Sequence, residues 1–396
     1  MQRQAVIRVG GTGVPLLQEV GGLPFLEQSL RHLARYGFRD VLLLSGPGDG
    51  ELRDRYPESE PLFGVRLRHV EAPTAGDLRA LRGKLSGHFL LLDAESFCPA
   101  NLELLWRVAV SGQADYAVAV SESAAVERLG SAALADDDLV TAVRTTGSSA
   151  GRTRGAVGLY LLHRGLLELL PAEELGSLRE LLHLASRSHA VQAVATPAPV
   201  FDVTRPEGLA ALPAALPTPT LFFDRDGVLN VDHGYVHTIE SFVWRRGARE
   251  ALAEAVRRGY QLIVATNQSG IARGYYGLEQ MHCLHDWMRR QLELAGAPLA
   301  AIYHCPHHPE GTVAPYAVAC DCRKPSPGML LQAIEDWTVD RERSLLFGDK
   351  PSDLEAARRA GVRGIAVTAG SLLEDVTAAL EEMAAGGVAR PGAAGP

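Results

Sequence analysis

The second half of the chain repeats one local pattern, in which an apolar run typical of a buried strand ends abruptly in polar side chains. The runs TLFF, LIVA and SLLFG are followed by DRDG at 224–227, TNQSG at 266–270 and DK at 349–350. Amphipathic segments accompany them, REALAEAVRRG after the first and DLEAARRAG after the third, the latter predicted to be a helix capped by Asp353. Strands that alternate with helices predict a parallel sheet, in which the carboxyl ends of the strands share one edge. We therefore expect the three polar clusters to meet in one pocket.

The first half of the chain shows the same alternation. AVIRV, DVLLLS and HFLLLD have strand character, and LEQSLRHLAR repeats leucine at helical spacing. Residues 206–219 (PEGLAALPAALPTP) lose this periodicity and accumulate proline and alanine, which is typical of a linker. The prediction is an α/β protein with two doubly wound, Rossmann-like domains at 1–212 and 220–383, a linker at 213–219 and a disordered tail at 384–396.

The overall charge limits the partners of this protein. The chain carries 39 basic and 47 acidic side chains, a net charge of −8. Nucleic acids and anionic membranes need clustered positive charge, so neither is expected as a partner. The longest uncharged stretch, 208–223, contains three prolines and is too short to span a bilayer. The opening MQRQAVIRVGG lacks the apolar core of a signal peptide, so we expect a cytoplasmic protein.

The polar clusters of the second half suit phosphoryl transfer. A phosphate monoester is dianionic, and carboxylates approach it only when a divalent cation neutralises the repulsion. Asp224, Asp349 and a main-chain carbonyl near Asp226 are the predicted magnesium ligands. Asp224 would attack phosphorus and form an aspartyl-phosphate. Asp226 would protonate the leaving alkoxide and then activate water, while lysine and main-chain donors stabilise the phosphoryl oxygens.

A second metal is predicted from the cysteines. The chain has five, three of them within 18 residues, which favours a metal site in a reducing compartment over disulfides. Cys305-Pro-His307 and Cys320-Asp-Cys322 form two short pairs that can fold together into a tetrahedral Cys₃His zinc site. Because protein fills all four positions, the zinc is predicted to be structural. It would hold the loop that brings Arg323 and Lys324 to the phosphate.

The second half also resembles a known family over residues 220–370. DRDG, TNQSG, RKP and GDKPSD match, in order, the four signatures of the haloacid dehalogenase phosphatase superfamily. DRDGVLNVDHGYVHTIESF, TNQSGIARGYY, YHCPHHPEG and CDCRKPSPGMLL are similar to its bacterial D,D-heptose 1,7-bisphosphate phosphatases. The resemblance implies removal of the 7-phosphate from the heptose bisphosphate while the anomeric phosphate is kept. Histidinol phosphate is the rival substrate, since relatives with the same metal pattern hydrolyse it.

The same resemblance implies roles for individual residues. Asp224 is the nucleophile, Asp226 is the acid/base, and Thr266 and Lys324 steady the phosphoryl group. Magnesium is held by Asp224, Asp226 and Asp349. The residues implied to contact the sugar phosphate substrate are Asp232, His233, Gly234, Tyr235, Thr266, Asn267, Gln268, Ser269, Arg323, Lys324 and Lys350.

The first half is similar, more loosely, to sugar-phosphate nucleotidyltransferases, through EVGGLPFLEQSLRHLARYGFRDVLLLSG, HFLLLDAES and FDVTRPEGL. Val14, Leu16 and Leu23 stand at or near positions where that family has basic side chains, and Glu95 replaces an aspartate, although Asp202 matches. Departure of pyrophosphate needs cationic contacts. We therefore expect a domain with weak or lost transferase activity. The alternative is a bifunctional enzyme that also transfers a nucleotidyl group to heptose 1-phosphate.

Overall fold

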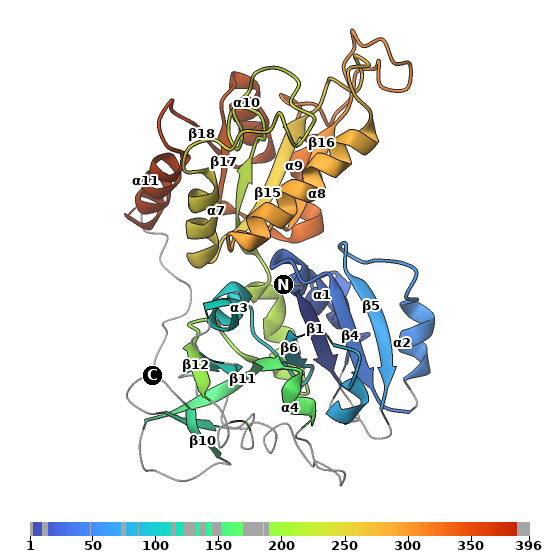
Figure 1. Ribbon diagram of the computed structural model, residues 1–396, viewed down its shortest axis with the longest axis vertical. Coiled ribbons are helices and arrows are strands. Elements are labelled where there is room, and N and C mark those ends of the chain that lie inside the picture. The colour runs from blue at the N-terminus through green and yellow to red at the C-terminus, as the bar shows by residue number, and fades with distance from the viewer. Residues whose placement is uncertain are drawn as a thin grey trace. The chain divides into compact units, whose positions relative to one another are not determined.

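The computed structural model (Figure 1) divides the chain into two compact units, Met1–Leu216 and Pro217–Pro396. The residues that it describes are 3–9, 15–47, 49–72, 77–85, 87–111, 114, 116–121, 131–134, 140–144, 152–168, 185 and 190–385. The glycine-rich segment at 10–14, which includes Val14, and the tail at 386–396 lie outside these residues. Among the described helices, none combines the length and the apolar character needed to cross a bilayer.

In the described residues of the N-terminal unit, nine strands form one mixed sheet. Four of them run parallel in the spatial order β6 (His88–Asp93), β1 (Gln4–Arg8), β4 (Asp40–Ser45) and β5 (Arg66–Glu71). The long strand β11 (Arg152–His163) runs antiparallel to β6, β8 (Tyr116–Ser121) and β9 (Ser131–Leu134). The remaining strands are β10 (Val140–Arg144) and β12 (Val191–Ala195). The predicted α/β class is confirmed, but the sheet is not wholly parallel, because β11 pairs antiparallel with the strand at the edge of the parallel part.

The described residues of the N-terminal unit also form helices. They are α1 (Phe25–Arg35), α2 (Gly50–Arg55), α3 (Leu102–Ser111), α4 (Gly165–Glu168) and α6 (Pro206–Ala211), with 3₁₀ turns at Leu78–Leu81 and Leu212–Ala215. Of these helices, α3 and α4 pack on strands of the sheet. Two short ladders pair β2 (Glu19–Val20) with β3 (Leu23–Pro24), and β7 (Ser96–Phe97) with β13 (Phe201–Asp202). One large cluster of buried apolar side chains includes Val6, Leu42, Leu91 and Tyr160 from four different strands. Burial of these side chains stabilises the sheet.

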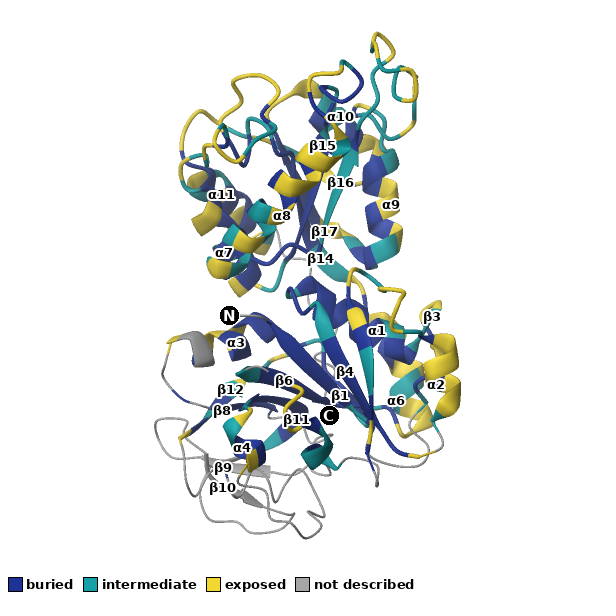
Figure 2. Ribbon diagram, turned by 45° about the vertical axis from the view of Figure 1, so that its right-hand side comes forward, coloured by how far each residue is buried: buried dark blue, intermediate teal, exposed yellow. Residues whose placement is uncertain are grey.

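The C-terminal unit has a wholly parallel sheet of five strands. Their spatial order is β16 (Ala301–Cys305), β15 (Gln261–Asn267), β14 (Thr218–Phe223), β17 (Val339–Gly348) and β18 (Arg363–Ala366). The helices α7 (Ala248–Arg257), α8 (Leu278–Leu294) and α11 (Leu372–Ala385) lie on one side of the sheet, and α9 (Gly328–Trp337) and α10 (Pro351–Ala360) on the other (Figure 2). The buried central strands, drawn dark blue in Figure 2, explain why their sequences are continuous apolar runs.

The strand order of this sheet locates its ligand site. From the central strand β14 the chain first proceeds outward on one side, to β15 and β16, and then crosses to β17 on the other side. The point where the order reverses therefore lies between β14 and β17, and the crevice at the carboxyl ends of two such strands is where ligands bind in open α/β sheets. Phe223 and Phe347 are register partners there, and their fully buried rings stack 5.2 Å apart.

The stretch expected to be a linker is largely structured. Residues Pro206–Ala211 form α6, Leu212–Ala215 form a 3₁₀ turn with Leu212 fully buried, and β14 begins at Thr218. Two of the four prolines that suggested a linker, Pro206 and Pro213, lie in the first turns of the two helical segments, where an N–H has no helical partner to lose. Pro219 lies where the register between β14 and β17 shifts, a position at which a strand tolerates proline. At the other end, α11 extends to Ala385, beyond the expected domain end at 383.

Candidate active site

Three carboxylates gather at the reversal point of the C-terminal sheet. Asp224 directly follows β14, Asp349 directly follows β17, and Asp353 lies in the first turn of α10. One oxygen of each lies within 4.8 Å of the others. We call this group the acid cluster. Partial burial raises the pKa of the Asp349 carboxyl, and although Lys350 opposes this, the charges of Asp224 and Asp353 raise the pKa further. A cluster of this kind favours a cation.

Asp353 is a member of the cluster that the sequence did not predict as a site residue. It was expected to cap α10, but the helix begins at Pro351 and its cap position is Lys350. Because proline is well suited to the first helical position, the boundary moves three residues toward the N-terminus. Asp353 then occupies the third helical position, and its carboxylate accepts a hydrogen bond of 3.0 Å from the Lys350 main-chain N–H. Its other oxygen, Oδ1, lies 2.8 Å from Lys324 Nζ.

Gly227 allows the loop that follows Asp224 to lie against the acid cluster. Its φ of +87° is a conformation that favours glycine. A Cβ atom at this position would lie 2.2 Å from the Asp349 carboxylate oxygen, which is too close for any side chain. The Gly227 N–H donates to the Asn230 carbonyl at 2.9 Å, and its carbonyl accepts from Arg245 at 3.0 Å. The glycine of the DRDG segment therefore sets the distance between that loop and Asp349.

Lys324 supplies the positive charge of the site. Its Nζ lies 3.0 Å from an Asp224 oxygen and 2.8 Å from an Asp353 oxygen, and the residue is 2% exposed. Burial alone lowers the pKa of a lysine, but the two carboxylates outweigh it and raise the pKa of Lys324 above its usual value. The side chain is therefore a buried ammonium group that lies between the predicted nucleophile and Asp353.

Asn267 positions Lys324 through the main chain. Its Nδ2 donates to the Lys324 carbonyl at 3.0 Å, and its Oδ1 accepts from the Lys324 N–H at 3.1 Å. Both main-chain hydrogen-bonding groups of Lys324 are thus paired with a single amide side chain at the end of β15. Asn267 is one of the residues predicted to contact substrate, and in the structure its amide is hydrogen-bonded to the main chain of Lys324.

The carboxylate of Asp226 is not part of the acid cluster. Arg225 Nη2 lies 2.9 Å from each of its oxygens, Asn230 Nδ2 donates to Oδ1 at 3.1 Å, and Gln268 Nε2 donates to Oδ2 at 3.0 Å. Of the three predicted magnesium acids, the structure brings together Asp224 and Asp349 and turns the third toward Arg225. If Asp226 supplies a ligand to magnesium from this position, that ligand is its main-chain carbonyl. A main-chain carbonyl near Asp226 was predicted for this role from the sequence.

Thr266 and Gln268 line the site from the end of β15. Thr266 is fully buried, and its hydroxyl accepts a hydrogen bond of 2.8 Å from Gln268 Nε2. Gln268 Oε1 accepts from the Tyr276 hydroxyl at 2.7 Å, and burial raises the pKa of Tyr276 to about 12. Ser269 is half-buried beside them. The TNQS segment is therefore a buried polar layer rather than a solvated loop.

The loop at 231–243 carries the next group of predicted substrate contacts. Asp232 forms an ion pair of 3.2 Å with Lys350 and accepts from the Gly234 N–H at 3.0 Å. Partial burial disfavours the charge, but this N–H and Lys350 hold the pKa of Asp232 below its usual range. The exposed Tyr235 packs its ring edgewise on Tyr275 at 4.6 Å, and His233 is exposed. One ion pair therefore links this loop to the residue that follows Asp349.

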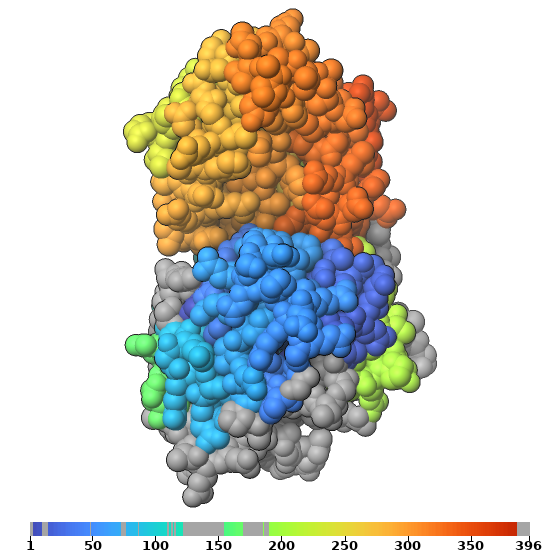
Figure 3. All heavy atoms as spheres, turned by 90° about the vertical axis from the view of Figure 1, so that its right-hand side faces the viewer, coloured from blue at the N-terminus to red at the C-terminus, as the bar shows by residue number. Residues whose placement is uncertain are grey.

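The four predicted zinc ligands come together. The three sulfur atoms are 3.2–3.5 Å apart, and His307 Nδ1 lies 3.3 Å from Cys322 Sγ and 3.7 Å from Cys305 Sγ. A tetrahedral zinc with metal–sulfur bonds of about 2.3 Å places its sulfur ligands about 3.8 Å apart, so the donor set fits zinc. Cys305 is the last residue of β16, and Arg323 donates to the His307 carbonyl at 3.4 Å. The loop between β16 and α9 that carries this group projects from the unit, in orange in Figures 1 and 3.

Comparison with known proteins assigns the family. Over 144 residues the chain is 48% identical to the D-glycero-beta-D-manno-heptose-1,7-bisphosphate 7-phosphatase of Photorhabdus laumondii, and the match covers 36% of this chain and 77% of that protein. The chain belongs to this heptose bisphosphate phosphatase family. A family model described as HAD-hydrolase-like matches residues 321–388.

Two solved structures are also similar to parts of the chain. The D,D-heptose 1,7-bisphosphate phosphatase of B. bronchiseptica, complexed with magnesium and phosphate, is 32% identical, with a TM-score of 0.35 and coverage of 41% of this chain and 86% of that chain. A UDP-glucose pyrophosphorylase from Acinetobacter baumanii is 15% identical, with a TM-score of 0.48 and coverage of 54% of this chain and 92% of that chain.

Arg225 and His285 are two buried residues of this family member that sequence reasoning left without a role. The Arg225 guanidinium is fully buried, and its Nη1 lies 3.1 Å from His285 Nε2 on α8. Burial, followed by the charge of Arg225, holds the pKa of His285 well below its usual value, so the imidazole is neutral. Arg225 was visible inside DRDG as a charged residue next to a buried strand. No local signal marked His285, because its partner is 60 residues away.

The predicted acids of the N-terminal unit lie near one another, because β7 pairs with β13 so that Ser96 lies opposite Asp202. Asp93, at the end of β6, forms an ion pair of 3.0 Å with Arg8. Burial and the charges of Asp93 and Asp202 raise the pKa of Glu95, and Asp202 accepts a hydrogen bond from the Thr204 N–H at 3.1 Å. Leu16 is buried and Leu23 is half-buried. Neither position is exposed in the way that is typical of the basic side chains that the similar family has at or near it.

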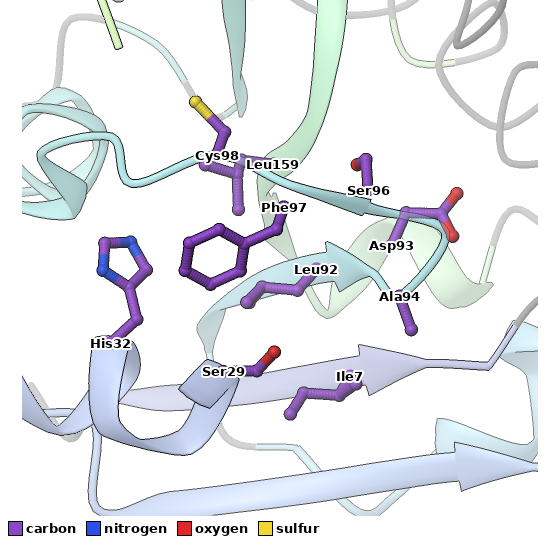
Figure 4. Close-up of a pocket in the computed structure, with 10 residues that line it drawn as sticks. All are labelled: Ile7, Ser29, His32, Leu92, Asp93, Ala94, Ser96, Phe97, Cys98 and Leu159. Carbon is purple, nitrogen blue, oxygen red and sulfur yellow. The ribbon is translucent and has the colours of Figure 1, made fainter. Parts of the chain in front are cut away.

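One small cavity in this unit is shown in Figure 4. It measures about 10 Å³ and is lined by Ile7, Ser29, His32, Leu92, Asp93, Ala94, Ser96, Phe97, Cys98 and Leu159. That volume holds about one water molecule, whereas pockets for drug-sized ligands measure about 300–1,000 Å³. This cavity is therefore not a site for a nucleotide or a sugar phosphate.

Proposed function

We propose that this protein is a magnesium-dependent phosphatase that removes the 7-phosphate of D-glycero-D-manno-heptose 1,7-bisphosphate through an aspartyl-phosphate intermediate. The observation that carries the proposal is the buried Lys324, which lies between Asp224 and Asp353 at the reversal point of the sheet, with Asp349 alongside. The matched relatives are named for the same reaction on the heptose bisphosphate. The run NVDHGYVHTIE, together with GIARGYY, favours heptose over histidinol phosphate.

The donor set of the acid cluster fits magnesium. It consists of carboxylate oxygens, the ligands that this hard cation prefers, and three carboxylates against one ammonium leave two negative charges to be balanced. Asp224, Asp349 and the main-chain carbonyl of Asp226 would hold the ion. When bound, it supplies the positive charge that lets a dianionic phosphate approach Asp224.

Asp224 is suited to be the nucleophile. It is 5% exposed, and one of its oxygens is held by Lys324 at 3.0 Å and by the Arg225 N–H at 2.8 Å. A carboxylate oxygen of Asp224 attacks phosphorus as the bond between phosphorus and the sugar oxygen breaks. Lys324 Nζ and the Thr266 hydroxyl stabilise the negative oxygens of the transferred group.

Asp226 completes the reaction as the acid/base. A protonated Asp226 gives its proton to the leaving sugar oxygen, which departs as an alcohol. The resulting carboxylate then takes a proton from the water that attacks the phosphorus of the aspartyl-phosphate, and inorganic phosphate is released. Both steps require the Asp226 carboxyl to reach the reacting oxygen.

We assign a structural role to zinc within this proposal. Cys305, His307, Cys320 and Cys322 supply all four positions of a tetrahedral site, so water has no place on the metal. The chain from Cys322 continues directly into Arg323 and Lys324. Zinc would therefore stabilise the loop that delivers the ammonium group to Asp224.

The test measures phosphate release from heptose 1,7-bisphosphate and from histidinol phosphate, with the Asp224→Asn variant as the control. We expect faster turnover of the heptose substrate, with inorganic phosphate and heptose 1-phosphate as products. We expect the variant to stay folded and to keep less than about a hundredth of the activity, because loss of a nucleophile costs several orders of magnitude. Much faster turnover of histidinol phosphate would reject the heptose assignment, and a variant with near-normal activity would reject covalent catalysis by Asp224.

A further inference from the structure

The carboxylate of Asp226 is surrounded by donors that are themselves almost completely buried. Arg225 is fully buried, Gln268 is 1% exposed, and Asn230 is fully buried. They contribute contacts of 2.9, 3.0 and 3.1 Å to the two oxygens. Each of these donors has other partners that limit its movement. The orientation of the Asp226 side chain therefore depends on the residues that fix its hydrogen-bond donors in place.

His285 holds the first of these donors. A guanidinium group can only donate hydrogen bonds, so His285 Nε2, 3.1 Å from Arg225 Nη1, must be the acceptor and the proton of the neutral ring must be on Nδ1. Arg225 Nη2 also donates to the Val236 carbonyl. The guanidinium is thus fixed from α8 on one side and from the 231–243 loop on the other, and its remaining donors face Asp226.

Tyr276 holds the second donor. A carboxylate is acceptor-only, so the NH₂ group of Gln268 must face Asp226 and its Oε1 must face the Tyr276 hydroxyl, 2.7 Å away. The Tyr276 hydroxyl therefore donates and keeps the amide in this orientation. The ring of Tyr276 stacks on His237 at 4.7 Å and an interplanar angle of 4°, and it packs in a buried cluster with Ile271 and Met281. The phenol thus has little freedom to rotate away.

We infer that His285 and Tyr276 are positioning residues for the acid/base of this phosphatase: His285 acts through Arg225, and Tyr276 acts through Gln268, to direct the carboxyl group of Asp226. The inference rests on the function proposed above. Neither residue contacts the acid cluster. His285 reaches the site through Arg225, and Tyr276 reaches it through Gln268, which also donates to the Thr266 hydroxyl, so the double-mutant cycle measures how much of each effect passes through Asp226. Their elements are separate in sequence from the DRDG segment, which is why the two contacts exist only in the folded unit.

The test is a pair of double-mutant cycles measured as kcat/KM for heptose 1,7-bisphosphate. The single variants are His285→Leu, Tyr276→Phe and Asp226→Asn, and each of the first two is also combined with Asp226→Asn. General acid–base catalysis contributes about 10²- to 10⁴-fold, and we expect each positioning variant alone to lose about 10- to 100-fold of that. In the Asp226→Asn background the same substitutions should cost less than about threefold, because the group they direct is gone.

A second readout uses p-nitrophenyl phosphate, whose leaving group is a weak base and departs without a proton. With this substrate the positioning variants should keep most of their kcat/KM, because the chemical step no longer needs the acid. His285→Gln restores an acceptor for Arg225 and should recover most of the loss seen in His285→Leu. Tyr303→Phe, which removes a hydroxyl bonded to Asp336 at 2.6 Å, is the matched control and should leave kcat/KM unchanged.

The outcomes separate this inference from the proposed function. If the unmodified enzyme releases no phosphate from the heptose bisphosphate, the proposed function fails, and the inference fails with it. If the unmodified enzyme is active but the losses in His285→Leu and Tyr276→Phe add fully to that of Asp226→Asn, the two residues do not act through Asp226 and the inference alone is overturned. An equal loss on both substrates, with no recovery in His285→Gln, overturns it as well.

Discussion

The substitution Gly227→Ala tests how the DRDG loop meets the acid cluster. Two costs follow from the structure. The first is the backbone conformation, since a φ of +87° costs an alanine about 1–2 kcal/mol of stability. The second is a collision, since the new Cβ would lie 2.2 Å from an oxygen of Asp349. Ordinary carbon contacts begin near 3.4 Å, so this pair must separate by about 1 Å.

Asp349 is the partner that must move. The N–H and the carbonyl of Gly227 are each hydrogen-bonded, to Asn230 and Arg245, so the loop itself is held in place. A magnesium ligand bonds at about 2.0–2.1 Å in a strict octahedral geometry, and a displacement of 1 Å removes it. Misplacement of a catalytic group by this distance costs about 100-fold in rate. We therefore expect kcat to fall about 100-fold or more and the magnesium concentration for half-maximal activity to rise.

Gly259→Ala is the matched control for this experiment. Gly259 has a φ of +90° at the end of α7, and no atom lies within 4 Å of the Cβ it would gain. Urea unfolding should show the backbone cost in both variants, and a further loss of stability in Gly227→Ala from the collision with Asp349. Only Gly227→Ala should lose activity in a phosphate-release assay titrated with magnesium. If Gly227→Ala has the same kcat and the same magnesium dependence as Gly259→Ala, the close approach of Gly227 to Asp349 does not affect catalysis.

Three further predictions concern other parts of the chain. Zinc analysis should find about one zinc per chain, and Cys322→Ser should lower zinc content and kcat together; a fully active, zinc-free protein would refute the site. Incubation with heptose 1-phosphate and each nucleoside triphosphate should release little or no pyrophosphate, and robust release would show an active N-terminal unit. Because the pKa of His285 lies well below the 6.5 of a free histidine, unfolding lets this ring bind a proton below pH 6.5, so stability should fall as the pH drops through that range. His285→Gln should reduce that slope by up to about 1.4 kcal/mol per pH unit, and urea unfolding at pH 5 and 7.5 checks it.

Much of the C-terminal unit could be predicted from local sequence. Apolar runs that end in polar clusters are a consequence of a buried parallel strand whose carboxyl end faces a ligand crevice. Asp224 and Asp349 follow two such runs, and the structure brings them together as expected. The four predicted zinc ligands were equally visible, and the structure brings them together, because the spacing within each pair is short enough for the local chain to set their geometry.

Two prolines near the unit boundary and the start of α10 show where local rules misled. Proline was taken as a sign of irregular structure between the units, yet Pro206 and Pro213 lie in the first turns of helical segments. Pro351 similarly moves the start of α10, which converts Asp353 from a helix cap into a member of the acid cluster. The meaning of a proline depends on whether its N–H would have had a partner, and that is decided by the neighbouring turns.

The amino-acid sequence alone determined which side chains lie at the carboxyl ends of the strands. In a parallel sheet all strands run in one direction, so the residue that follows each strand lies at the same edge of the sheet. The sequence did not determine which way those side chains turn. Asp226 faces Arg225 rather than Asp349, Asn267 holds the main chain of Lys324, and His285 reaches Arg225 from another element, because each orientation depends on a hydrogen-bond partner far away in the chain. Only the packing of the helices and loops around the sheet brings such partners within 3 Å or so, and buried polar groups then take the orientation in which all of them are paired.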